Sequence, residues 1–124
     1  MRTSHKVFMG DSCMSDADMA VVSTLYQKPI GVHEARTFYE IVCRDYGILA
    51  PSLKFTGTDY RMRRGTIQYH SNRVLIHKKG ETVATVVHEL AHCLSYRLDH
   101  VSGHGRNFAK YFHELLLAAN GLLY

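Results

Sequence analysis

The 124-residue sequence has no apolar run long enough to cross a membrane, because the longest unbroken run covers only residues 115–119. Its basic N-terminus also lacks an apolar stretch of signal-peptide length. The three cysteines, Cys13, Cys43 and Cys93, form no CxxC pair, which argues against a disulfide framework or a cysteine-based zinc cluster. We therefore expect a cytoplasmic protein with reduced thiols and no membrane contact.

Internal repeats and low-complexity segments are also missing, and the length suits one domain. A hydrophobic content of 46% is too high for a disordered chain. The net charge of +4 permits nucleic acid or acidic partners but does not require them. A break at residues 28–31 divides the chain into an N-terminal arm, residues 1–30, with a short helix over 16–27, and a domain over 31–124.

The spacing of apolar residues predicts the α+β class, with helices packed on a small antiparallel or mixed sheet. The first half of the domain reads as a helix and three strands, and the second half as two helices. The expected elements are a helix over 32–46 ended by Gly47, a strand around 53–55, a hairpin over 66–77 with a two-residue turn at 71–72, a helix over 81–98, a loop over 99–105 and a last helix ending near 120–121.

Nine histidines are many for this length, and two of them form an HExxH motif, HELAH, at residues 88–92. The motif lies inside the best-predicted helix, where residues four apart share one face, so His88 and His92 can hold one metal ion. Imidazole nitrogen is a good ligand for zinc. Glu89 flanks the same face, where it can take a proton from a water that the metal activates.

Catalytic zinc usually has three protein ligands, so one more is expected downstream. The metzincin pattern requires histidine at position 98, where this chain has Leu98, so that class is excluded. His104 is the best candidate, because glycines on both sides let the backbone approach the ion closely. Glu114 is the alternative, and would give a site with two histidines and one glutamate. His100 and His113 are expected at the surface.

HELAH at 88–92, followed by GHGRNF at 103–108, resembles the SprT-like zinc metallopeptidases, a family that pairs HExxH with a downstream HGxxF box. The resemblance spans roughly residues 33–118 and implies a zincin-like fold, with the sheet packed against the HExxH helix. The family includes proteases that digest proteins crosslinked to DNA. No cysteine-rich zinc ribbon follows the domain, so this chain is expected to be a minimal form.

Carried over to this chain, the resemblance implies zinc on His88, His92 and His104, with Glu89 as general base. The expected function is zinc-dependent hydrolysis of peptide bonds in a protein or peptide substrate, which extends to DNA-associated proteins. A non-catalytic zinc-binding domain or a DNA-interaction domain is the alternative. An extended peptide could pair with the sheet edge offered by the hairpin at 66–77.

The sequence leaves two questions about this hypothesis undecided, namely which residue stabilises the oxyanion and whether the basic residues face DNA. The donor that stabilises the oxyanion is one of Tyr96, Tyr111 and His113. The basic residues form either a DNA-facing patch or an ordinary solvated surface, and we favour the solvated surface. These residues are Arg61, Arg63, Arg64, Arg73, Lys78, Lys79, Arg106 and Lys110.

Overall fold

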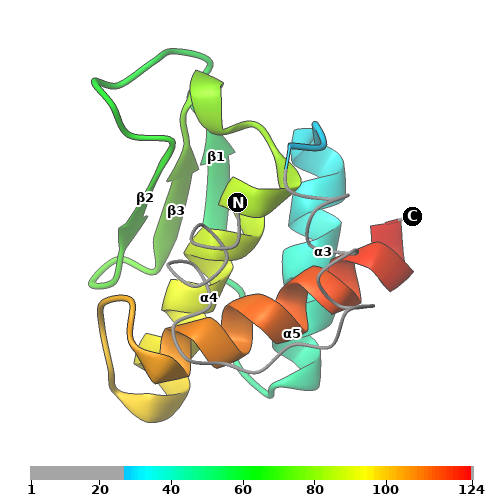
Figure 1. Cartoon of the computed structure of the whole chain (residues 1–124), viewed down its shortest axis with the longest axis vertical. Helices are drawn as coiled ribbons and strands as arrows, with labels where there is room; N and C mark the ends of the chain where they lie inside the picture. Colours follow the sequence, from blue (N-terminus) through cyan, green and yellow to red (C-terminus); the bar gives the residue numbers. More distant parts are fainter. Residues whose placement is uncertain (1–26, 124) are drawn as a thin grey trace.

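The computed structural model describes residues 27–123, and its elements follow the predicted order (Figure 1). The α+β class is confirmed. The elements are α3 (Val32–Asp45), β1 (Ser52–Phe55), β2 (Gly65–Gln68), β3 (Arg73–Ile76), the 3₁₀ turn η1 (Lys78–Gly80), α4 (Val83–Asp99) and α5 (Arg106–Leu123). The predicted helix at 16–27 falls almost wholly outside the described residues. The domain boundary at residue 30 stays a prediction.

The three strands form a mixed sheet in the order β1-β3-β2 (Figure 1). β1 runs parallel to β3, and β2 runs antiparallel to it. In the central strand Val74 and Ile76 are fully buried while Arg73 is exposed. This alternation follows from the two-residue period of a strand and shows that one face of the sheet covers the core.

The hairpin was predicted correctly, but its turn was not. The connection spans four residues, 69–72, instead of the two expected at 71–72. The amide of Asn72 donates to the carbonyl of Tyr69 at 3.2 Å, and Asn72 takes a left-handed conformation with φ of 53°. Tyr69 stacks on Tyr96 of α4 with ring centroids 4.3 Å apart, so the chain leaves the strand ladder earlier than its β-propensity suggests.

Helices α3 and α4 both pack against the sheet, and α5 crosses α4 (Figure 1). The Tyr39 hydroxyl of α3 donates to the carbonyl of Val86 in α4 at 2.6 Å, inside the core. Phe108, Leu115 and Leu116 of α5 are buried as its helical spacing predicted. Packing on both sides makes α4 the most buried helix of the described residues, which fixes the HExxH segment in place.

The ends of the helices follow local chemistry. Gly47 has φ of 73° and follows the last turn of α3, as predicted, because glycine adopts this conformation without strain. The Thr82 side chain accepts from the amide of Thr85 and starts α4. His100, with φ of 58°, ends α4 and turns the chain toward α5. The predicted surface position of His100 is confirmed, since its side chain is exposed.

Two sequence-based exclusions hold for residues 27–123. No helix there combines the length and apolarity that crossing a bilayer requires. Cys43 and Cys93 are both buried and unbridged, whereas Cys13 lies outside the described part of the chain.

Gly80 joins the sheet to the segment that starts α4, and its position leaves no room for a side chain. A Cβ atom there would collide with the carbonyl oxygen of Arg64, which itself accepts from the amide of His77 at 2.9 Å. We expect Gly80→Ala to lower the free energy of unfolding by about 2 kcal/mol, measured by urea denaturation. Gly121→Ala in α5, where a Cβ meets nothing within 4 Å, is the control and should be neutral or stabilising. Equal stability of the two variants would contradict this account.

Candidate metal centre

The two histidines of the HExxH motif lie one turn apart on the face of α4 that meets α5. Their ring centroids are 4.8 Å apart, and their Nε2 atoms approach to 3.2 Å. The spacing of four residues produces this arrangement directly, because such residues stand above one another on a helix. The expected pairing of His88 and His92 is therefore observed.

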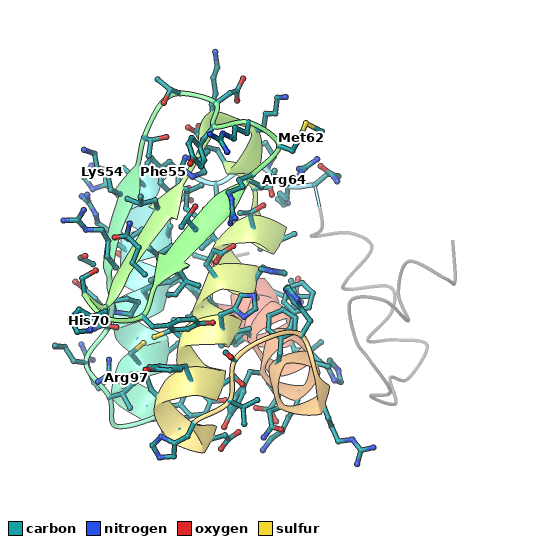
Figure 2. The ribbon with its side chains drawn as sticks, turned by 90° about the vertical axis from the view of Figure 1, so that its left-hand side faces the viewer. Lys54, Phe55, Met62, Arg64, His70 and Arg97 are labelled. Atoms are coloured by element: carbon teal, nitrogen blue, oxygen red, sulfur yellow. The ribbon has the colours of Figure 1, made fainter. Side chains whose placement is uncertain are left out.

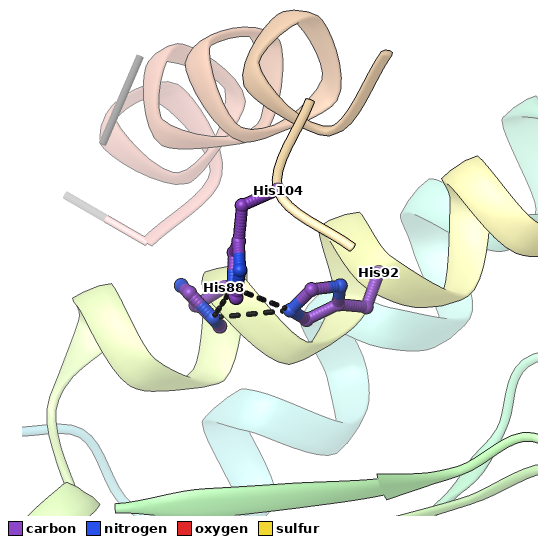
Figure 3. Close-up of side chains that lie close together, drawn as sticks. All are labelled: His88, His92 and His104. Atoms are coloured by element: carbon purple, nitrogen blue, oxygen red, sulfur yellow. Dashed lines mark hydrogen bonds between the residues drawn. The ribbon is translucent and has the colours of Figure 1, made fainter. Parts of the chain in front are cut away.

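His104 reaches the same point from the loop between α4 and α5 (Figure 3). Its Nε2 atom lies 3.1 Å from that of His92 and 3.2 Å from that of His88. Gly103, with φ of 92°, bends the chain just before His104, and the close approach of the backbone expected from the flanking glycines stays a prediction. The described residues thus contain one cluster of three imidazoles that could hold a metal ion.

Hydrogen bonding alone does not account for this triangle. A neutral imidazole nitrogen carries either one hydrogen or one lone pair, so three mutually close Nε2 atoms can satisfy only one of their three contacts. Around a tetrahedral zinc with Zn–N distances of about 2.0–2.1 Å, three nitrogens lie about 3.3–3.4 Å apart. The observed separations of 3.1–3.2 Å are close to this value, so the donor set fits a metal ion.

Burial keeps the imidazoles of His88 and His92 neutral and their lone pairs available. Burial, reinforced by the neighbouring His92 and His104 rings, lowers the pKa of His88 to about 3. Burial and His104 lower the pKa of His92 to about 4. Protonated rings would repel a cation, so both shifts favour the ligand form near neutral pH.

Phe108 forms an apolar wall behind all three imidazoles. Its ring centroid lies 4.8 Å from that of His88, 4.5 Å from His92 and 4.9 Å from His104, and its side chain is 1% exposed. The Nδ1 atom of His92 is buried and has no hydrogen-bond partner among residues 27–123. The orientation of the His92 ring is therefore set by packing against Phe108.

Glu89 lies next to this cluster in a gap under the edge strand β2. Its side chain is 6% exposed. Burial raises its pKa to about 7, although the nearby Arg63 guanidinium opposes the shift. The gap depends on Gly65, because a Cβ there would lie 3.0 Å from both Cγ and Oε2 of Glu89. A carboxyl group so placed can exchange a proton near neutral pH.

A cleft of about 370 Å³ opens beside His88 and Glu89. It runs along the first turn of α4 toward the loop that precedes β2. The other lining residues are Gln27, Met62, Arg64, Gly65, Thr82, Ala84, Thr85 and Phe112. A bound molecule in this cleft would therefore reach both the imidazole cluster and the buried carboxyl group.

The alternative third ligand, Glu114, is not brought to the cluster. Its Oε1 atom accepts from the Tyr46 hydroxyl at 2.9 Å, at the end of α3. The structure thus joins His104, and not Glu114, to the HExxH histidines. The position of His113 is half-buried on α5, where the sequence suggested a surface residue.

The oxyanion donor proposed from the sequence stays a prediction. Tyr96 is 41% exposed and stacks on Tyr69, whereas Tyr111 is buried and hydrogen-bonded to Asp99. Sequence reasoning did not place Gly65 or Arg63 beside Glu89, because the pairing of β2 with β3 brings both there. A glycine just before the expected hairpin was the available signal for Gly65.

Comparison with known families covers far more of the chain than the HExxH and HGxxF motifs. The SprT-like family matches over residues 23–121, which is most of the chain. The chain belongs to the SprT-like family. Comparisons with curated proteins and with solved structures found no match. The family assignment confirms the resemblance recognised from HExxH and HGxxF, and the three clustered histidines are consistent with a metallopeptidase-type domain.

The third ligand can be tested by metal content. We expect His104→Ala to lose stoichiometric metal, because two imidazoles alone leave the ion weakly held. Glu114→Ala should keep the metal, since it removes only the hydrogen bond with Tyr46. Metal would be counted by mass spectrometry after gel filtration of both purified variants. Retention by His104→Ala with loss by Glu114→Ala would reverse the assignment.

Proposed function

We propose that this chain is a zinc-dependent endopeptidase with a zincin-like site, in which Glu89 is the general base. The observation that carries the proposal is the convergence of three imidazole nitrogens within 3.2 Å of one another, beside a buried carboxyl group at the end of a cleft. A merely structural metal site has no need of that carboxyl group. The SprT-like family match supports the same reading.

His88, His92 and His104 would hold the metal through their Nε2 atoms. Imidazole nitrogens suit zinc, and a three-ligand protein site leaves a fourth position for a small molecule. When bound, zinc supplies Lewis-acid polarisation of the scissile carbonyl and of the attacking water. Phe108 keeps the side of the cluster that faces α5 dry and holds the rings in their orientations.

Glu89 would accept the proton of the attacking water at a carboxylate oxygen and deliver it to the leaving amine. Two properties suit this carboxyl group to both steps. Its position under β2 keeps it close to the ligand cluster, and Gly65 leaves the space that it occupies. Burial limits competing exchange of its proton with bulk solvent.

The free edge of β2 is the proposed site for an extended peptide. Within the described residues β2 pairs only with β3, so its other edge is available beside the cleft. Substrate main chain could add to this edge as a further strand, which recognises backbone more than side chains. This corresponds to the sequence-based expectation for the hairpin and implies that many sequences can be bound.

A more specific version of the proposal is that the substrates are DNA-associated proteins. Part of the predicted basic set gathers near the cleft, because the Arg64 guanidinium donates to the carbonyl of Lys79 at 3.4 Å. Arg61 and Arg63 belong to the same loop, and all of these side chains are exposed. A DNA-facing patch and a solvated surface are both compatible with this arrangement, and DNA binding stays a prediction.

The general base is tested by Glu89→Gln. We expect this variant to retain zinc but lose at least about 100-fold in the rate of casein cleavage, because the amide cannot accept the proton. Glu114→Gln makes the same chemical change outside the cluster and should keep full activity. Both rates would be measured after reconstitution with one equivalent of zinc. Zinc-loaded wild type that cleaves no protein or peptide would favour a non-catalytic metal-binding domain.

The space in front of Glu89 is tested by Gly65→Ala. The added methyl group would press on Cγ and Oε2 of Glu89 at 3.0 Å and displace the carboxyl group. We expect kcat to fall by about 10- to 100-fold while zinc content and thermal stability change little. Unchanged kcat would mean that proton transfer does not depend on the observed position of Glu89.

A further inference from the structure

The cleft beside His88 and Glu89 has the size of a side-chain subsite. Its volume of about 370 Å³ lies at the lower end of the range typical for ligand pockets, and is enough for one long side chain. If a peptide lies along β2, the residue next to the scissile bond must project into this space. The chemistry of the lining then decides which side chains are favoured.

The lining combines apolar walls with one cation. Met62 provides exposed apolar surface, Phe112 lines the cleft with a side chain that is only 1% exposed, and Ala84 is small enough to leave depth above α4. Arg64 supplies the positive charge from the loop before β2. Figure 2 shows Met62 and Arg64 together on this loop, at the opposite edge of the sheet from Lys54. Such a lining suits a side chain with an apolar stem and a negatively charged tip.

The Arg64 backbone is fixed while its guanidinium is available. Its carbonyl accepts from His77 at 2.9 Å and packs against Gly80, which anchors the residue. Its side chain is exposed, and its hydrogen bond to the Lys79 carbonyl is long, at 3.4 Å. Because a guanidinium has five N–H donors, most of them remain free to bind a carboxylate.

The described residues that line the cleft include no acidic side chain beside Arg64 at its outer part. Glu89 is the one acidic residue among those lining it, and it lies at the end next to the imidazole cluster. Thr82, Ala84 and Thr85 belong to the start of α4, where the helix dipole is positive. The guanidinium and the helix end therefore add to a field that attracts anions and repels cations.

We propose that this cleft selects an acidic side chain, glutamate above all, next to the scissile bond, and that Arg64 is the residue that sets this specificity. The inference rests on the proposed peptidase function. The methylene groups of the substrate glutamate contact Met62, and its carboxylate meets Arg64. Lysine and arginine at this position are disfavoured, so a basic DNA-associated substrate would be cut in its acidic segments.

The experiment profiles cleavage of a mixed peptide library by the zinc-loaded protein, with cleavage sites identified by mass spectrometry. Wild type, Arg64→Glu and Lys54→Glu are compared. Lys54→Glu is the matched control, because it changes the net charge equally on the exposed side of β1. We expect wild type and Lys54→Glu to prefer glutamate at one position flanking the cut. In Arg64→Glu the glutamate-to-lysine ratio should fall at least about fivefold, in line with an exposed ion pair that is reversed in sign.

A binding measurement separates failure of this inference from failure of the proposed function. Fluorescent peptides that differ only in glutamate or lysine are titrated against zinc-loaded wild type and Arg64→Glu, with anisotropy as readout. Cleavage with equal preference in wild type and Arg64→Glu would overturn the specificity assignment and leave the peptidase standing. It is also possible to test the subsite if no peptide is cut. Wild type should then bind the glutamate peptide more tightly than the lysine peptide, and Arg64→Glu should lose this difference. That result would support the acidic subsite without supporting the peptidase. Equal binding of both peptides would overturn it.

Discussion

The site depends on the crossing of α5 over α4. This contact buries Phe108 against the imidazoles and brings the connecting loop back over the HExxH turn. Without it, the two histidines of α4 would lie on the surface of an amphipathic helix with no third partner. The crossing is driven by ordinary apolar burial, with Phe112, Leu115 and Leu116 in the same stripe. The core therefore determines the geometry of the polar cluster.

The same packing shifts the pKa values of two neighbouring residues in opposite directions. Burial disfavours charge on His88 and also on Glu89, yet the first effect yields a neutral ligand and the second a carboxyl group that titrates near neutrality. The two residues are adjacent in sequence but face different neighbours. His88 contacts Phe108 and His104, whereas Glu89 lies beneath the glycine at the start of β2. One helical turn thus presents an imidazole and a carboxyl group to one cleft.

Sequence reasoning placed correctly those structural features that have a local signal. The HExxH spacing, the helical stripe of α4 and the glycine-flanked His104 are all readable within a few residues, and each is found where it was expected. The choice between His104 and Glu114 needed the path of a loop, which spacing alone did not determine. The predicted length of the hairpin turn was wrong, because Tyr69 stacks on Tyr96 and this contact joins segments that are distant in sequence.

The parts of the site that escaped prediction come from strand pairing. Gly65, Arg63 and Arg64 precede or begin β2, and only its antiparallel register with β3 carries them to the side of α4. Such long-range pairing leaves little trace in the local sequence. Family resemblance did not supply these residues either, because its specific part was confined to two short boxes, one on α4 and one that spans the end of the following loop and the start of α5.

The short chain separation of the three imidazoles has a consequence for assembly of the protein. His88 and His104 are 16 positions apart, and His92 lies between them, 12 positions from His104. Closing so small a loop costs little chain entropy, and the helical hairpin that contains it makes mostly local contacts. All the ring contacts of the imidazole cluster lie within residues 88–112, so the cluster is contained in the α4–α5 hairpin and needs no contact with the sheet.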